Sequence, residues 1–534
     1  MTEVSRRTVV KTTAALAAMS MKPAFAGVEK PKRPNIVLFT LDDCDADSLG
    51  CFGCTLKGIT PHLDALAARG MTFKYAHTNS STCQPSRLSM MSGLDPQSLG
   101  LRGHVDPLPP GTPTLPAILR ANGYYTGIIG KISHYPPKEA FNWSRSYKVG
   151  YENVAGAELS ADVWDDSFDG YWSMWRVPQG FYHGTRQLVR EAKSIDRPFF
   201  LHLNTSDPHR PWPGSLDEAT WFRDPPFKAV NMPMRPYEKN YSPVEVPLPG
   251  YLPDLPGVRV DRAQYFSALH NGDKSFGRIV EALRSEGVYE DTVFICLSDQ
   301  GASFPMSKQS LYHYATNLNL IIYWPGLAAG GTMNTNAMIS IVDIMPTILD
   351  VLGIPQPAKI DGKSFARLFS DPSAEVRDVL FSSYNYARTG LQVYPMRSAL
   401  TRRFQYIYNA WPGQTNLSPP TPLVYDGRID PLSGLCWMSM KEAAKRDLAI
   451  RERVTFIRSR VNEEFYDLDA DPYCLKNIVA LPEHAEAVAA LKSQLEAELV
   501  RFGDPILDIF RGNGAIPVAW LSRAPAKALP VVHD

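Results

Sequence analysis

The chain has 534 residues, of which 44% are hydrophobic and 21% are charged, and this is the composition of an ordinary globular protein too long for one small core. Lysine plus arginine and aspartate plus glutamate both number 55, so the charge balance gives no reason to expect a nucleic acid or a membrane surface as the partner. We expect one large domain and a smaller one.

The N-terminus has the pattern of an export signal. Arg6 and Arg7 precede a short apolar stretch, and the small-x-small sequence Ala24–Ala26 follows it. A charged region, an apolar region and a cleavage site occur in this order in signal peptides, and the apolar run is too short to span a bilayer. The paired arginines resemble a twin-arginine signal. We therefore predict a signal peptide over residues 1–26 and a periplasmic or secreted protein.

The mature chain then alternates between apolar, β-branched runs and stretches with helical spacing. Helices are expected where a capping residue or a proline precedes apolar residues three and four apart. In chain order we expect strand 35–41, helix 60–70, helix 114–123, strand 124–130, strand 197–204, helix 261–285, strand 292–298, strand 318–324 and helix 340–353. Strands that alternate with helices predict a wound α/β sheet.

From about Arg377 onwards the pattern changes to short strand-like runs followed by one helix over 484–502. These runs cover residues 379–385, 403–409 and 463–469. They predict a smaller antiparallel sheet with a packed helix. The expected divisions of the chain are a large domain over 33–375, a C-terminal subdomain over 376–510 and a tail over 511–534.

The cysteines are too few and too scattered for a disulfide framework. There are seven in the chain, and an odd number leaves at least one unpaired or altered. Cys51 and Cys54 have the spacing of one local disulfide. Cys83 is the candidate for the altered residue, because it stands directly before polar residues, a proline and an arginine.

Acidic and amide side chains follow two of the predicted strands. Asp42 and Asp43 follow strand 35–41, and Asp299 and Gln300 follow strand 292–298. Sites in wound sheets gather beyond the carboxyl ends of the strands, where three carboxylates would repel each other without a cation. Carboxylate and amide oxygens suit Ca²⁺ or Mg²⁺ rather than zinc. These four residues are therefore candidate metal ligands.

Cationic side chains are expected near the same edge. Two further strand ends carry Lys131 with His134, and Asp207 with His209. Together with Arg87 and Lys308 they could surround an anion. The anion expected from this pattern is a sulfate or a phosphate group.

The segment CQPSR, Cys83 to Arg87, resembles the C-x-P-S-R motif of the formylglycine-dependent sulfatases. Further matches follow in order between Asn35 and about Pro505: LDDCDADSLGCFG, TPHLDALAARGMTF, GIIGKISH, DPHRP, LSDQG, KQSLY and EEFYDLDADP. Within this family the chain resembles above all the sulfamidases, the N-sulfoglucosamine sulfohydrolases. That likeness is carried by RPFFLHLNTSDPHR, DQGASFPMSKQSLY and YPMRSA.

The resemblance implies a fold, a modification and a metal. The fold is that of the alkaline phosphatase superfamily, an α/β sheet sandwiched by helices, with residues 33–375 as the catalytic domain. Cys83 would be oxidised to formylglycine (3-oxoalanine) by a formylglycine-generating enzyme during maturation. The modified residue would bind Ca²⁺, or alternatively Mg²⁺, together with Asp42, Asp43, Asp299 and Gln300.

The resemblance also implies catalytic roles. One hydroxyl of the hydrated aldehyde attacks sulfur, and the other then collapses to release sulfate from the covalent intermediate. Arg87 holds the hydrate, and Lys131 and Lys308 bind the sulfate oxygens. His209 protonates the leaving group, and His134 takes a proton from the hydrate.

Three positions depart from the family pattern. Gln300 stands where the family has Asn or His, and its side chain is one methylene longer. His134 lies three residues after Lys131, whereas sulfamidases have two. Lys308 stands where sulfamidases have arginine. These departures bear on the substrate more than on the chemistry.

The expected activity is hydrolysis of a sulfate ester or sulfamate, on a sulfated small molecule or saccharide of the N-sulfoglucosamine type. One alternative is a phosphonate or phosphodiester hydrolase of the same superfamily, because phosphoryl and sulfuryl groups share their shape. Another is a non-catalytic protein that binds sulfated glycans. A homodimer is also left open.

Overall fold

The computed structural model describes residues 33–103, 106–147, 176–221, 236–328, 330–385, 395–410, 434–458 and 460–513. All of them belong to one compact unit that begins at Arg33. The signal peptide predicted over 1–26 and all but the start of the predicted tail lie outside the described residues. The boundary predicted after residue 375 stays a prediction.

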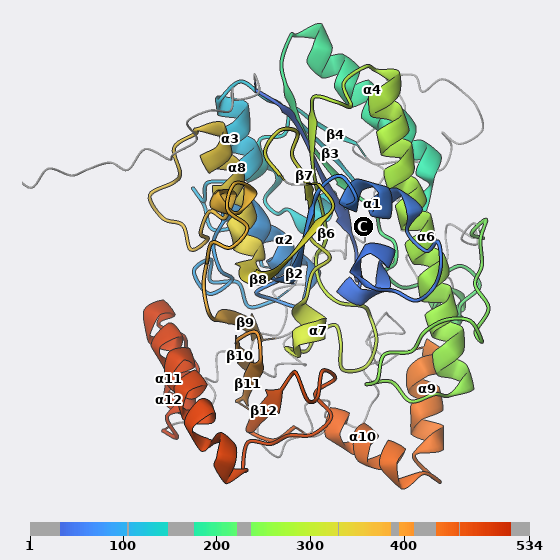
Figure 1. Ribbon diagram of the computed structural model, residues 1–534, viewed down its shortest axis with the longest axis vertical. Helices are drawn as coiled ribbons and strands as arrows, with labels where there is room; N and C mark the ends of the chain where they lie inside the picture. Colours follow the sequence, from blue (N-terminus) through green and yellow to red (C-terminus); the bar gives the residue numbers. More distant parts are fainter. Residues whose placement is uncertain are drawn as a thin grey trace, which may run out of the picture. The chain divides into compact units, whose positions relative to one another are not determined.

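The larger of two sheets has eight strands in the order β4-β3-β5-β1-β6-β7-β2-β8 (Figure 1). The strands are β1 (Asn35–Leu41), β2 (Met71–His77), β3 (Tyr125–Ile129), β4 (Arg145–Tyr147), β5 (Phe199–Asn204), β6 (Thr292–Ser298), β7 (Ile321–Tyr323) and β8 (Thr332–Ser340). Every pairing is parallel except those of β7 with β6 and β2.

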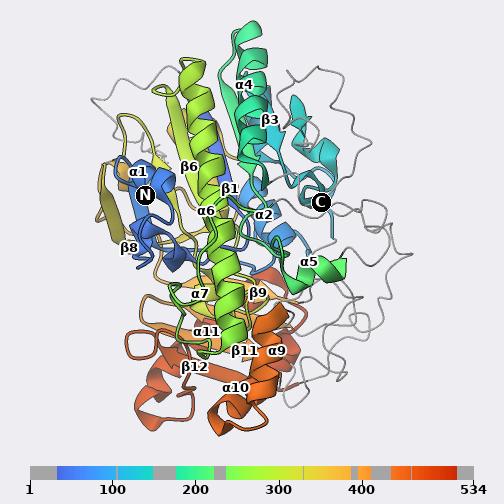
Figure 2. The same ribbon diagram turned by 90° about the vertical axis from the view of Figure 1, so that its right-hand side faces the viewer.

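Helices cover both faces of this sheet. The face formed by Val37 and Phe39 packs on α1 (Pro61–Ala67), α4 (Pro178–Ser194) and α6 (Pro256–Ser285). The face formed by Ile36 and Leu38 packs on α2 (Cys83–Ser92), α3 (Leu115–Ala121) and α8 (Ile344–Leu352). Successive residues of a strand point to opposite faces, so a strand covered on both faces has a nearly continuous apolar run, as β1 has over Ile36–Phe39. The predicted wound α/β sheet between helices is confirmed (Figure 2).

The smaller sheet is antiparallel, with the order β12-β11-β10-β9. Its strands are β9 (Leu380–Tyr384), β10 (Met396–Leu400), β11 (Phe404–Asn409) and β12 (Glu463–Asp467). Leu491, Leu495 and Leu499 lie one helical turn apart on α11 (Ala485–Phe502) and pack against this sheet. The predicted antiparallel sheet with one packed helix is confirmed.

The remaining helices are α5 (Leu216–Trp221), α7 (His313–Thr316), α9 (Gly434–Ala443), α10 (Leu448–Arg458) and α12 (Leu507–Phe510). No helix within the described ranges is long and apolar enough to cross a membrane. The helix expected over 340–353 begins later than predicted. Ser340 ends β8, and its side chain forms a reciprocal cap with Asp343 over a short 3-10 turn, Ile341–Asp343, before α8 starts. The apolar period alone does not reveal this cap.

Candidate active site

The acidic residues that follow β1 and β6 meet at one edge of the sheet. β1 lies between β5 and β6 and runs parallel to both, so the carboxyl ends of all three strands point the same way. The backbone N–H of Asp299 donates to Leu41 O at 3.3 Å, and that of Asp42 donates to Asp207 O at 3.1 Å. The side chains of Asp42, Asp43 and Asp299 are all fully buried there.

Cys83 is the first residue of α2 and faces these acids. Its thiol is 3.9 Å from Asp43 Oδ1, and Gln300 Nε2 lies 2.9 Å from the sulfur. Ser86 Oγ donates to Asp299 O at 2.6 Å, which holds the first turn of the helix against the end of β6. The structure therefore brings Cys83 together with Asp43 and Gln300.

Arg87, one turn after Cys83, is buried among acceptors. Its guanidinium donates to Asp299 Oδ2 at 2.9 Å, to Asn204 Oδ1 at 2.7 Å and to Thr40 Oγ1 at 3.0 Å, and it lies 3.4 Å from Asp42 Oδ1. A planar fork with several partners in fixed positions has little freedom to move. It holds one positive charge between two of the acids.

The two predicted lysines each meet one of the paired aspartates. Lys131 Nζ is 2.5 Å from Asp42 Oδ2. Lys308 Nζ lies 2.8 Å from Asp43 Oδ2 and 3.0 Å from His209 Nε2. Gly130 precedes Lys131 with φ +75°, and a Cβ there would stand 2.3 Å from Asn204 O. Glycine is therefore required where the chain turns Lys131 into the site.

His209 reaches the same group from the loop after β5. Its Nδ1 lies against the carbonyl of Arg210. A carbonyl only accepts, so Nδ1 carries the proton and Nε2 faces Lys308 and Asp43. Burial, together with the Lys308 ammonium, holds the pKa of His209 well below its usual range.

His134 is placed by the turn that follows Lys131. It ends the 3-10 turn Ile132–His134 and is buried, and its Nδ1 is 3.4 Å from Ser133 Oγ. The contacts above link the other predicted site residues directly to one another. The role of His134 as a base stays a prediction.

The three buried acids do not share the same protonation preference. Burial raises the pKa of Asp299 to about 7, with Asp42 and Asp43 adding to the shift, although Arg87 opposes it. Burial also raises the pKa of Asp43. Burial acts the same way on Asp42, but Lys131 and the other nearby cations outweigh it and hold the pKa of that carboxyl well below its usual range. Crowded carboxylates of this kind disfavour full ionisation unless a further cation lies among them.

The donor set fits a divalent cation that prefers oxygen. Ligand atoms of Asp42, Cys83 and Asp299 lie within 4.8 Å of one another. Among the described residues, Gln300 Oε1 is buried without a hydrogen bond, while Nε2 faces Asp43 Oδ1 at 2.5 Å. The two ends of an amide have nearly the same shape, so a cation among the acids would favour Oε1 in place of Nε2. Three carboxylates and one amide oxygen are ligands typical of Ca²⁺.

Sequence reasoning missed the residues that hold this cluster in place. Asp45 Oδ1 accepts from the N–H of Ala302 at 2.7 Å and from Ser307 Oγ at 3.3 Å. Its Oδ2 accepts from Tyr251 at 3.3 Å and Arg262 at 3.4 Å. Asp45 thus joins the loop of Asp42 to the loop that carries Gln300 and Lys308. The one available signal was a third acid in the stretch DDCD.

Three further aromatic side chains lie outside the charge cluster and make core or backbone contacts. His202 is buried within β5 and bonds Tyr135 OH through Nε2 at 2.5 Å. Trp212 is fully buried. His313 Nε2 bonds the carbonyl of Pro472 at 2.5 Å. Cys51 and Cys54 are free thiols, so the local disulfide considered for them is absent from the structure.

Known proteins resemble the chain over most of its length. A family model described as Sulfatase matches residues 34–354, and one described as N-sulphoglucosamine sulphohydrolase, C-terminal, matches residues 304–414. Human N-sulphoglucosamine sulphohydrolase is 28% identical over 480 residues, which cover 87% of this chain and 89% of the human protein.

Solved structures share the fold. One, described as a complex with its substrate D-glucosamine-2-N,6-O-disulfate, has a TM-score of 0.61 at 18% identity and covers 89% of this chain and 99% of its own. A phosphonate monoester hydrolase from Silicibacter pomeroyi has a TM-score of 0.55 at 19% identity and covers 88% of this chain and 95% of its own. At such identities the likeness shows the fold alone.

Proposed function

Because the chain belongs to the sulfatase family, we propose that it hydrolyses a sulfate ester or sulfamate on a sugar of the N-sulfoglucosamine type, with a formylglycine at position 83 and a calcium ion. The observation that carries this proposal is the position of Cys83. It starts α2 within reach of Asp43 and Gln300, in a cluster that also holds Arg87 and Lys308.

An unmodified Cys83 would be a poor nucleophile in this place. Burial raises the pKa of its thiol far above the usual range, and Asp42 and Asp299 oppose ionisation further although Lys308 favours it. The thiolate is the reactive form of cysteine. Conversion to formylglycine by a modifying enzyme would supply, as the hydrate, an oxygen nucleophile with a second hydroxyl for the release of sulfate.

Asp42, Asp43, Asp299 and Gln300 would hold the Ca²⁺. A metal there supplies positive charge that favours an ionised hydroxyl and offsets the charge of a sulfate. Mg²⁺ is the alternative, and its stricter octahedral geometry fits a longer Gln300 side chain less readily.

The chain's own cations would then position the sulfate. Lys131 and Lys308 bring two ammonium groups to the edge where Asp42 and Asp43 lie. Preorganised positive charge is the largest expected contribution for a group ringed by negative oxygens. The Arg210 carbonyl accepts from Nδ1–H of His209, so Nε2 faces the site. Nε2 would give a proton to the leaving group from the doubly protonated ring, a form that a bound sulfate nearby would favour.

The choice of a sugar rests on the relatives. Human N-sulphoglucosamine sulphohydrolase aligns along nearly the whole chain, and the second family model carries the same description. The phosphonate monoester hydrolase shares the fold, so a phosphonate ester stays the competing substrate. The predicted twin-arginine signal supports a place of action in the periplasm or outside the cell.

The test combines a mass and a rate. The peptide that contains Cys83 should be lighter by about 18 Da, because conversion exchanges sulfur for oxygen and removes two hydrogens. The converted protein should release sulfate from N-sulfoglucosamine and from p-nitrophenyl sulfate faster than it cleaves a phenyl phosphonate ester. Faster cleavage of the phosphonate would move the assignment to the competing substrate, and full activity with unmodified Cys83 would refute the nucleophile.

A further inference from the structure

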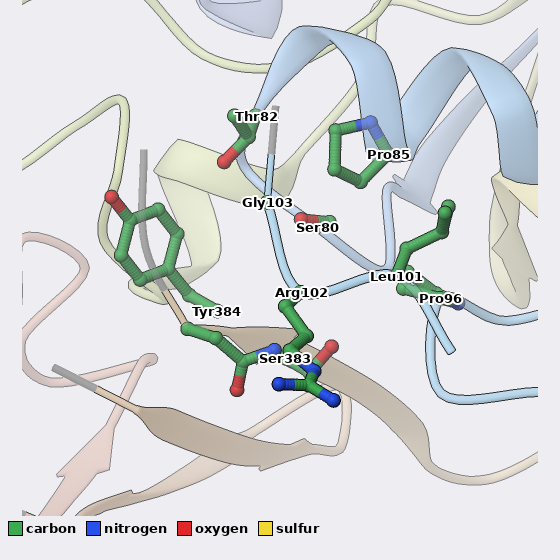
Figure 3. Close-up of a pocket in the computed structure, with 10 residues that line it drawn as sticks. Ser80, Thr82, Pro85, Pro96, Leu101, Arg102, Gly103, Ser383 and Tyr384 are labelled. Atoms are coloured by element: carbon green, nitrogen blue, oxygen red, sulfur yellow. The ribbon is translucent and has the colours of Figure 1, made fainter. Parts of the chain in front are cut away.

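The pocket beside the first turn of α2 is too small to take part of a substrate. It is lined by the start of α2, the loop after α2 and the end of β9 (Figure 3). Its cavity volume is about 10 Å³, which is room for about one water molecule. A leaving group has no room there, whereas His209 in the charge cluster faces the site where one would depart.

The loop that carries His209 is held by one buried arginine. Arg176 lies two residues before α4 and is buried. Its Nη2 donates to the backbone carbonyl of His209, and its Nη1 donates to the carbonyl of Pro211 at 2.6 Å. Along the chain, these two carbonyls lie on either side of the Arg210 carbonyl. The planar guanidinium thus spans the peptide group that orients the His209 ring.

Arg176 is itself fixed by a buried network. Its Nε lies 3.5 Å from Asp207 Oδ1, and its Nη1 donates to Tyr237 OH at 3.0 Å. Tyr237 OH donates in turn to Asp207 Oδ1 at 2.8 Å. Asn271 Nδ2 donates to Asp207 Oδ2 and to the carbonyl of Arg176, both at 2.7 Å. All four residues are buried, so the guanidinium has few alternative positions.

The Arg210 carbonyl decides which nitrogen of His209 faces the site. It accepts from Nδ1–H, which leaves Nε2 directed at Lys308 Nζ, 3.0 Å away. The Arg210 side chain is anchored on Asp217 and Asp261 at 2.7 Å, but a side-chain anchor does not fix the rotation of the peptide group. If the carbonyl turned away, the neutral ring would lose the contact that selects its tautomer.

We propose that Arg176 is a positioning residue for proton transfer to the leaving group, because it holds the backbone of 209–211 so that Nε2 of His209 stays directed into the site. This inference deepens the proposed function and rests on it, since His209 is the acid there. Arg176 then matters most for leaving groups that need a proton.

The test compares two aryl sulfates of similar size, p-nitrophenyl sulfate and phenyl sulfate. Phenolate is the poorer leaving group, because no nitro group spreads its charge, so it gains more from protonation. Arg176→Met should lower kcat/KM for phenyl sulfate about 10- to 100-fold more than for p-nitrophenyl sulfate. Arg176→Lys keeps the charge but not the planar fork. It should shift the ratio in the same direction by less, and it replaces Arg176→Met if that variant does not fold.

Arg397→Met is the matched control. Arg397, in β10, is also a buried arginine that pairs with a carboxylate, that of Asp504. It also donates to two backbone carbonyls, those of Tyr384 and Met396. The variant should lose stability but leave the ratio of the two substrates as in the parent protein.

A double variant shows whether Arg176 acts through His209. His209→Ala alone should slow phenyl sulfate selectively, and adding Arg176→Met should leave the ratio of the two substrates unchanged. Equal losses for the two substrates in Arg176→Met would overturn the positioning role, because they would indicate a charge that acts on the sulfate common to both. A selective loss that persists without His209 would overturn it as well.

Nitrogen NMR of isotope-labelled histidine gives a readout that does not depend on turnover. At a pH where the ring is neutral, the parent and Arg397→Met should show His209 as the Nδ1–H tautomer, and Arg176→Met should show a mixture of both tautomers. His209→Ala assigns the signals. A ring that stays in the Nδ1–H form in Arg176→Met would overturn the inference. A converted, calcium-loaded parent that cleaves no sulfate would instead refute the proposed function, and the spectrum would still decide whether Arg176 orients the ring.

Discussion

Buried carboxylates are paired with cations in different ways beside the two sheets. At the carboxyl edge of the large sheet, Asp42, Asp43 and Asp299 crowd together, and burial raises the pKa of two of them. Behind the small sheet, the Asp504 carboxylate accepts from the Arg397 guanidinium at 2.7 and 3.0 Å and from the N–H of Ile506 at 3.1 Å. The second arrangement is balanced within the chain. The first sets three acids among three cations, Arg87, Lys131 and Lys308. If the two lysines bound a sulfate, the acids would need a further cation to stay ionised together.

We interpret the acids of the large sheet as residues that serve the chemistry, and the Arg397–Asp504 pair as one that serves stability. Removing one partner of a buried ion pair costs several kcal/mol of unfolding free energy, but the pair does not take part in the reaction. A crowded set of acids costs stability, and a metal can compensate for it. Substitutions in the cluster of the large sheet should therefore mainly lower activity, whereas substitutions in the Arg397–Asp504 pair should mainly lower the free energy of unfolding.

The largest effect is expected at Cys83. Cys83→Ala should lower kcat on p-nitrophenyl sulfate by at least about 10⁴-fold, because the nucleophile is lost. The melting temperature should stay close to that of the parent, since the change removes a single atom. Steady-state kinetics with calorimetry measure both. A variant with substantial turnover would place the nucleophile elsewhere.

Breaking the pair of Arg397 and Asp504 should lower stability and leave activity nearly unchanged. Arg397→Met should cost about 3–5 kcal/mol of unfolding free energy, because it leaves Asp504 buried without its partner. Activity per folded molecule on p-nitrophenyl sulfate should change little. Urea unfolding gives the energy, and active-site-normalised rates give the activity.

The Asp43→Asn variant gives the corresponding stability measurement for the acids of the large sheet. In chelator-treated protein it should destabilise less than Arg397→Met does, because burial opposes ionisation of Asp43 although Lys308 favours it, and the asparagine still offers Lys308 an amide oxygen. Calcium binding, followed by titration calorimetry, should be lost. Equal losses of unfolding free energy in the two variants, with calcium still bound by Asp43→Asn, would contradict this difference between the two groups of acids.

An intermediate effect is expected at Asp45, which joins the two loops of the site. Asp45→Ala should cost about 1–3 kcal/mol and leave the Ala302 N–H without its acceptor. Because Lys308 and Gln300 lie on the same loop, kcat and calcium affinity should fall as well. Asp343→Ala is the control, since Asp343 is a buried cap that bonds Ser340, Lys363 and Arg377. It should lose stability without loss of calcium affinity.

The last effect is a pH dependence at Asp273, which is spread over several pH units. This buried acid accepts from the N–H groups of His62 and Leu63, and burial raises its pKa to about 7. The folded state therefore keeps a proton that the unfolded state has released. The resulting stability is full below about pH 4 and is lost as pH rises through 7, with a slope of at most about 1.4 kcal/mol per pH unit. Unfolding in urea across this range should show a shallower decline for Asp273→Asn; an unchanged slope would assign the shift elsewhere.

The strands and the polar residues that follow them were predictable because each is encoded in a short, continuous stretch of the sequence. β1 is one apolar run that ends in Asp42 and Asp43, and β6 has the same form before Asp299. The supporting residues were not predictable, because their partners are distant in the chain. Ala302 lies 257 positions from Asp45, and Asn204 lies 117 positions from Arg87.

The most direct measurement is the release of inorganic sulfate from N-sulfoglucosamine by the calcium-loaded protein, with the fraction of converted Cys83 determined on the same sample. Sulfate release should rise in proportion to that fraction and disappear on chelation. Fully converted, calcium-loaded protein that releases no sulfate, or release that is independent of conversion, would contradict it.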